Sequence, residues 1–139
     1  MPELNLRVLI ADDHPVIRKG LRFLLESESD IEVIGEAGNG REAVELADEL
    51  HPSEIVMDIL MPITNGIEAT REILHRSPDT KVLMISSASD NDLIDGALSS
   101  GAVGYISKET SLLDVPRALR EIHRGRTFLM LGRARANIS

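Results

Sequence analysis

The sequence predicts an α/β protein in which five strand-and-helix repeats, (βα)5, build a doubly wound parallel sheet. Short apolar runs of strand length alternate with segments whose apolar residues recur at helical spacing. The loops between them are short, which fits consecutive parallel strands joined by helical crossovers. Right-handed crossovers place helices on both faces of such a sheet, so its strands are expected to be buried on both sides.

The first two repeats are marked by prolines, glycines and apolar spacing. Residues 6–11 form an apolar run, and Pro15 suits the first turn of the following helix, where its missing N–H is not needed. Residues 31–36 alternate as a second strand. The next helix follows the Gly-Asn-Gly turn at residues 38–40 and is expected to end near Pro52.

The third and fourth repeats continue the same pattern. A buried strand at residues 55–58 leads through a turn into a helix at residues 66–76. A fourth strand at residues 81–86 is followed by a helix at residues 90–100, which Gly101 ends as a C-terminal glycine. Both helices are amphipathic, as crossovers that cover a sheet should be.

The last repeat contains one awkward residue. A strand at residues 103–107 precedes a helix that lies between Ser111 and Arg124. Pro116 is too far inside for a first-turn proline if Ser111 is the N-cap. The helix therefore either begins nearer Asp114 or is kinked, and we favour the later start.

Length and composition predict one domain. The chain has 139 residues, of which 1–128 are expected to form the domain and 129–139 a C-terminal tail or truncated linker, with no effector domain present. The absence of cysteine excludes a disulfide framework and a Cys-based zinc site. The N-terminus has no signal-peptide pattern and no apolar run reaches bilayer length, so we expect a soluble, cytoplasmic protein without membrane contact.

The charge distribution is uneven along the chain. The net charge of −8 argues against a domain whose whole surface attracts nucleic acid. Residues 117–139, in contrast, hold six arginines and one glutamate. We favour a solvated helix face and a linker over a nucleic-acid patch, so we expect this domain itself to bind no nucleic acid.

Acidic residues follow two strands that should be neighbours. In the flavodoxin-like strand order 2-1-3-4-5, ligands bind at the carboxyl ends of strands one and three. Asp12, Asp13 and Asp58 would gather there. Three carboxylates repel one another unless a cation joins them, and Mg²⁺ is the natural candidate because it prefers hard oxygen ligands.

The two remaining strand ends carry groups suited to phosphoryl chemistry. Ser86 supplies a hydroxyl and Lys108 a mobile ammonium. A carboxylate such as Asp58 can act as the nucleophile that forms an aspartyl phosphate. Each residue alone is explained as well by a turn, a cap or a solvated surface. Their joint occurrence at four strand ends predicts a phosphoacceptor site.

Residues 5 to about 128 resemble a response-regulator receiver domain, the CheY-like phosphoacceptor module. The matching motifs are Asp-Asp after the first strand, Met-Asp-Ile-Leu-Met-Pro-x-x-Asn-Gly around Asp58, Ser86, and Gly-Tyr-Ile-Ser-Lys around Lys108. The runs Asp-Asp-His-Pro and Gly-Ile-Glu-Ala-Thr-Arg look most like the NarL/FixJ (LuxR-type) subgroup. Members of that subgroup usually append a helix-turn-helix DNA-binding domain.

The resemblance implies how Asp58 would work. Asp58 would accept a phosphoryl group from a sensor histidine kinase, with Mg²⁺ held by Asp13, Asp58 and the backbone carbonyl of Leu60. Asp12 would assist through water. No enzymatic activity is implied beyond self-phosphorylation from a donor and autodephosphorylation.

The resemblance also assigns the switch residues. Ser86 and Lys108 would hold the phosphoryl oxygens, and Tyr105 would turn inward as Ser86 moves, although an ordinary strand residue explains Tyr105 equally well. Three departures stand out: Asn65 replaces the commoner Asp, Ser86 the commoner Thr, and Pro116 could reshape the last helix and its interface.

Two-component signal transduction is therefore the expected function. The expected output is regulation of transcription through a DNA-binding domain absent from this chain. The alternatives are a single-domain phosphorelay or protein-interaction module, and a Mg²⁺-dependent phosphohydrolase. The hydrolase is disfavoured because such enzymes typically place a second carboxylate where this chain has Leu60.

Two smaller features remain open. Acidic residues of the fourth helix and arginines of the fifth could pair across a homodimer, formed through these helices or the last helix alone, but solvated faces explain them equally well. These residues are Asp90, Asp92, Asp95, Arg117, Arg120 and Arg124. A lone loop histidine such as His14 is more often structural or solvated than a metal ligand.

Overall fold

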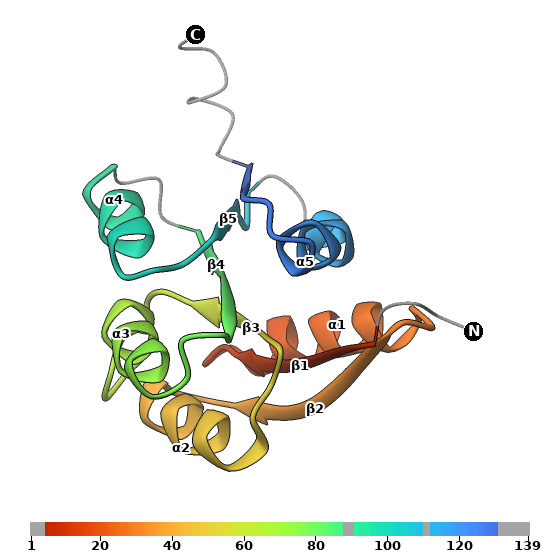
Figure 1. The fold of residues 1–139 in the computed structure, drawn as a ribbon, viewed down its shortest axis with the longest axis horizontal. Helices are drawn as coiled ribbons and strands as arrows, with labels where there is room; N and C mark the ends of the chain where they lie inside the picture. Colours follow the sequence, from red (N-terminus) through yellow and green to blue (C-terminus); the bar gives the residue numbers. More distant parts are fainter. Residues whose placement is uncertain (1–4, 88–90, 110–111, 131–139) are drawn as a thin grey trace, which may run out of the picture.

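A computed structural model of the chain describes residues 5–87, 91–109 and 112–130. Its centre is a parallel sheet of six strands in the order β2-β1-β3-β4-β5-β6 (Figure 1). The predicted order of the first five strands, 2-1-3-4-5, is confirmed. The strands are β1 (Leu6–Ala11), β2 (Ile31–Ala37), β3 (Glu54–Asp58), β4 (Lys81–Ser86), β5 (Gly104–Ser107) and β6 (Phe128–Met130).

Helices cover both faces of this sheet, as the crossovers require (Figure 1). α1 and α5 pack on one face and α2, α3 and α4 on the other, and each face has its own apolar cluster. The helices are α1 (Pro15–Glu26), α2 (Gly40–Leu50), α3 (Gly66–Arg76), α4 (Asn91–Ser99) and α5 (Val115–His123), with a 3₁₀ turn η1 (Leu112–Asp114). Among the described helices, none is long and apolar enough to cross a membrane.

β3 shows why the central strands are apolar along their whole length. All five of its residues are buried. Ile55 and Met57 face the cluster under α2, α3 and α4, whereas Val56 faces α1 and α5. A strand with helices on both faces has no side that faces solvent. Its successive side chains therefore point alternately into the two apolar clusters. Asp58 is the last residue of this strand, and Ile59 after it still packs in the cluster under α2, α3 and α4.

The start of α5 resolves the position of Pro116. Residues 112–114 form η1, and α5 begins at Val115 with Asp114 as N-cap, so the proline falls within the first two helical positions. There its missing N–H costs no intrahelical hydrogen bond. The predicted later start is confirmed, while Ser111 and the expected first residue of the fourth helix, Asp90, lie outside the described residues.

The structure adds a sixth strand, β6, to the five that the sequence predicts. Phe128–Met130 runs parallel to β5, so Leu129 and Met130, expected in the tail, belong to the sheet. A three-residue strand is too short to show an alternating pattern. Its place follows from α5, which crosses back over the sheet and returns the chain beside β5.

Candidate functional site

The loop after β1 holds Asp12 through local hydrogen bonds. The Asp12 Oδ1 atom accepts from the backbone N–H of His14 at 2.8 Å, and Pro15 then begins α1. Arg18 on α1 donates through Nη1 to the Asp12 carbonyl at 2.5 Å and through Nε to Glu36 on β2 at 3.0 Å. Arg18 thus links the backbone of Asp12 to both α1 and β2.

The loop after β3 is closed tightly around Asp58. The Gly66 N–H donates to the Ile59 carbonyl at 2.7 Å, and Asn65 caps α3 by accepting from the Glu68 N–H at 2.9 Å. Asn65 therefore keeps the capping role that an Asp would have. A Cβ built on Gly66 would lie 2.2 Å from the Asp58 carbonyl oxygen. Only glycine fits beside this backbone.

Replacing Gly66 by Ala is expected to displace the Asp58 backbone and lower the free energy of unfolding by about 2–4 kcal/mol, since a clash with backbone cannot be relieved by a rotamer change. Urea denaturation measures the loss. Gly20→Ala on α1 is the matched control: its Cβ meets nothing within 4 Å, so the helix should gain about 0.5–1 kcal/mol. Equal effects of the two changes would contradict the close approach at Gly66.

The predicted acidic residues do come together. One ligand atom each from Asp12, Asp13, His14 and Asp58 lies within 4.8 Å of the others. Lys108 Nζ is 2.9 Å from Asp12 Oδ2 and 3.5 Å from Asp58 Oδ2. The Asp12 and Asp58 side chains are 0% and 3% exposed. The Lys108 ammonium thus faces two buried carboxylates, whereas the Asp13 and His14 side chains are 29% and 62% exposed.

The donor set fits a hard divalent cation. Asp13 Oδ1 and Asp58 Oδ2 are buried and have no aligned hydrogen-bond donor among the described residues. Buried carboxylate oxygens without donors carry a desolvation cost that a bound cation removes. Oxygen atoms at this spacing suit Mg²⁺, which binds through one or two carboxylates and keeps several waters.

The electrostatics of the corner act most strongly on Asp58. Burial and the nearby Asp12 carboxylate raise the pKa of Asp58 to about 6, although Lys108 opposes the change. The ionised form is therefore held in an environment that disfavours its charge. A cation bound beside Asp58 would offset this electrostatic cost.

Ser86 is the last residue of β4 and Lys108 follows the end of β5, as predicted, whereas Tyr105 lies within β5. Ser86 and Tyr105 are each 1% exposed. Burial raises the pKa of Tyr105, and a side-chain hydrogen bond with Ser86 offsets part of this change. The Lys108 N–H donates to the Ser86 carbonyl at 2.9 Å, which joins the two strand ends. Tyr105 is thus turned into the protein beside Ser86.

Two site residues were missed or set aside in the sequence analysis. His14 Nδ1 lies 3.1 Å from oxygens of both Asp12 and Asp13 and 4.0 Å from Asp58 Oδ2. Its position next to the acid pair was the available signal. No pattern in the sequence marked Arg18, because its contact with the Asp12 carbonyl depends on how α1 packs. Leu60, expected to contribute its carbonyl, has an exposed side chain in the loop after Asp58.

The family model described as a response regulator receiver domain matches residues 8–120. The transcriptional regulatory protein LnrK of Bacillus subtilis is 41% identical over 120 residues, which cover 86% of this chain and 54% of LnrK. The response regulator protein VraR of Staphylococcus aureus is 42% identical over 122 residues, covering 88% of this chain and 58% of VraR. The chain spans little more than half the length of these relatives.

Solved structures agree with the fold. A LuxR-family two-component response regulator from Aurantimonas sp. SI85-9A1 superposes with a TM-score of 0.85 at 32% identity, covering 89% of both chains. The receiver domain of the response regulator NarL from Mycobacterium tuberculosis gives a TM-score of 0.84 at 29% identity, covering 88% of this chain and 99% of that one. These likenesses fit the subgroup that the sequence motifs indicate.

Proposed function

Because this chain belongs to the response-regulator receiver domain family, we propose that Asp58 accepts a phosphoryl group from a sensor histidine kinase and that the modified site switches an interaction surface. The observation that carries the proposal is the corner of the fold where Lys108 faces Asp12 and Asp58. This arrangement places a buried carboxylate nucleophile next to the Lys108 ammonium, which can also bind the negatively charged phosphoryl group after transfer.

In the proposed transfer an oxygen of the Asp58 carboxylate forms a bond to phosphorus as the P–N bond of the donor phosphohistidine breaks. The donor imidazole leaves with its bonding electron pair and takes up a proton. Lys108 and the Ser86 hydroxyl then bind the phosphoryl oxygens. Asp13, Asp58 and the Leu60 carbonyl would hold Mg²⁺, with Asp12 acting through water, and the metal would neutralise charge on the transferring group.

The proposed output is transcriptional. LnrK is named a transcriptional regulatory protein and VraR a response regulator, and this chain matches about half of each. We propose that the receiver acts through a DNA-binding domain, without catalytic turnover beyond its own phosphorylation and dephosphorylation. A cytoplasmic location remains a prediction. A single-domain phosphorelay module is the alternative.

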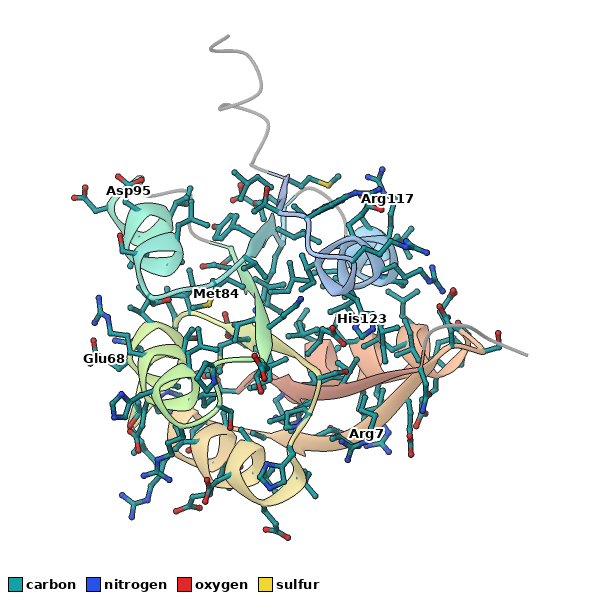
Figure 2. The ribbon with its side chains drawn as sticks, viewed as in Figure 1. Arg7, Glu68, Met84, Asp95, Arg117 and His123 are labelled. Carbon is teal, nitrogen blue, oxygen red and sulfur yellow. The ribbon has the colours of Figure 1, made fainter. Side chains whose placement is uncertain are left out.

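The homodimer expected through the fourth and fifth helices, or through the last helix alone, stays a prediction. Asp95 on α4 and Arg117 on α5 lie on opposite sides of the sheet, with β5 and β6 between them (Figure 2). Arg120 is used within the chain, where it binds Asp30 in a bidentate pair at 2.8 Å. Charge pairing across a dimer would therefore depend on the remaining exposed residues of these helices.

The proposal is tested by incubating the protein with Mg²⁺ and a small phosphodonor and measuring its mass. We expect an increment of one phosphoryl group that hydroxylamine removes and that Asp58→Asn abolishes. Asp79→Asn, the same change at an exposed loop position, should leave it intact. No increment on folded protein would overturn the switch, and rapid turnover of phosphomonoesters would favour the hydrolase.

An apolar groove beside the site supports a kinase helix as the donor partner. The groove has a volume of about 370 Å³ and is lined by α1 and η1 residues, among them Val16, Phe23 and Leu113. Phe23 is 80% exposed. Val16 follows His14 closely in sequence, so the groove lies next to the mouth of the acidic corner. Apolar anchors on one face of a partner helix would fill such a groove and bring a histidine to Asp58.

Phe23→Asp is expected to slow phosphotransfer from a purified sensor kinase at least tenfold by raising KM, because it places a charge in the apolar groove. Transfer from a small phosphodonor should not change, since Phe23 lies outside the acidic corner. Ser29→Asp, which adds the same charge at an exposed position outside the groove lining, serves as the control. Equal slowing with both donors would contradict a docking role for the groove.

A further inference from the structure

β6 lies directly beside the strand that carries Tyr105. The register pairs Gly104 with Phe128, Tyr105 with Leu129 and Ile106 with Met130. The Phe128 N–H also donates to the Val103 carbonyl at 3.1 Å. The three residues of β6 are therefore paired with β5 over most of its length.

The register determines which face each β6 residue occupies. Phe128 and Met130 pack against the apolar cluster under α1 and α5, and the Arg117 guanidinium lies 5.1 Å from the Phe128 ring centroid. Successive strand residues point to opposite faces. Leu129 therefore projects from the other face, where Tyr105 belongs to the cluster under α4.

On that face, Tyr105 has one neighbour in register on each side. Met84 of β4, labelled in Figure 2, flanks it toward the centre of the sheet and Leu129 flanks it toward the edge. Because neighbouring strands lie about 4.8 Å apart, side chains in register on one face are close neighbours. Tyr105 is 1% exposed and Leu129 53% exposed, so Leu129 is the residue that borders solvent at this edge.

We propose that β6 is a cap that shields Tyr105, the switch tyrosine, from solvent, with Leu129 as the positioning residue. In this proposal, the pairing of β6 with β5 and the inward position of Tyr105 stabilise each other. This inference rests on the proposed function, because it takes the position of Tyr105 to depend, through Ser86, on whether Asp58 is phosphorylated. A phosphoryl group that draws the Ser86 hydroxyl inward would then favour pairing of β6.

The short length of β6 is what makes such coupling workable. Three residues at a sheet edge make few hydrogen bonds and bury little apolar area, so the strand belongs to the part of a fold that opens locally at low cost. A small change in the interaction with Tyr105 can therefore shift the equilibrium between paired and unpaired β6. The same change would not open a long central strand. By linkage, whatever releases β6 must also weaken the inward state of Tyr105.

The cap can be measured because Tyr105 is the only tyrosine and the chain has no tryptophan. Acrylamide quenching of tyrosine fluorescence therefore reports the access of solvent to this one side chain. In the unphosphorylated full chain, Leu129→Ala should raise the quenching constant at least twofold. The matched control Leu113→Ala removes an equally apolar exposed side chain from η1 and should leave quenching unchanged. Equal quenching in wild type and Leu129→Ala would overturn the cap.

The coupling needs a second measurement, made on wild-type protein so that folding of a variant is not in question. With Mg²⁺ and the phosphoryl mimic beryllium fluoride, the Phe128 amide should exchange with solvent several-fold more slowly and tyrosine quenching should fall. Bound beryllium fluoride with unchanged exchange at Phe128 would overturn the coupling. Failure of Asp58 to bind the mimic or accept phosphate would instead contradict the proposed function, and the Leu129→Ala comparison would still decide the cap.

Discussion

Asp58→Asn is expected to stabilise the metal-free protein at pH 7 by about 2–3 kcal/mol, although it removes the residue on which the proposed function depends. The wild-type carboxylate is buried beside Asp12, and its pKa is raised to about 6. At pH 7 it must be ionised in surroundings that disfavour its charge. An amide of the same shape avoids that cost. Urea denaturation in the presence of a chelator measures the difference.

The same pKa gives the wild-type stability a defined pH dependence. Because the folded pKa of Asp58 is raised from 3.8 to about 6, the folded state binds more protons than the unfolded state between these values. Its contribution to stability is fully present below pH 4 and is lost as the pH rises through 6. Asp58→Asn should remove this component, and the control Asp79→Asn should retain it. A wild type and an Asp58→Asn variant with parallel pH profiles would contradict the raised pKa.

Mg²⁺ should reduce the difference in the free energy of unfolding between the wild type and Asp58→Asn. A cation that binds the folded state through Asp13 and Asp58 stabilises it by mass action, whereas the variant has lost one ligand. The unfolding midpoint of the wild type is therefore expected to rise with Mg²⁺ concentration and that of Asp58→Asn to rise much less. Equal Mg²⁺ responses would place the metal elsewhere.

Lys108→Met is expected to have the opposite effect, lowering the free energy of unfolding of the metal-free protein by about 2–4 kcal/mol at pH 7. The ammonium is 2.9 Å from Asp12 and 3.5 Å from Asp58, and its side chain is only 11% exposed. Its removal leaves buried carboxylates without their cation and should raise the pKa of Asp58 further, because Lys108 is the group that lowers it. Methionine keeps the apolar stem, so the loss reports charge rather than packing.

A double-mutant cycle checks the origin of this effect. In the Asp58→Asn background, Lys108→Met should cost about 1–3 kcal/mol less than in the wild type, since one of the unpaired charges is gone. Lys19→Met on the exposed face of α1 provides the control for loss of a lysine. An unchanged cost of Lys108→Met in both backgrounds would show that Lys108 and Asp58 are not coupled.

The site motifs could be predicted because each sits where a local pattern ends. Asp12 and Asp13 follow an apolar strand, Asp58 ends another, and Ser86 and Lys108 end two more. Parallel strands place their carboxyl ends at one edge of a sheet, so the strand order was enough to bring these residues together. The start of α5 was predictable for the same kind of reason, since proline restricts where a helix can begin.

What the sequence by itself determined was thus the strand order, the carboxylates at one edge and the position of their lysine, because strand periodicity, helix spacing and parallel topology are properties of neighbouring residues. Only the tertiary structure decided that Arg18 binds the Asp12 carbonyl and that β6 pairs beside Tyr105. It also decided that Arg120 is bound to Asp30, 90 positions away. Such contacts depend on how packed helices orient long side chains, and no local pattern along the chain specifies that orientation.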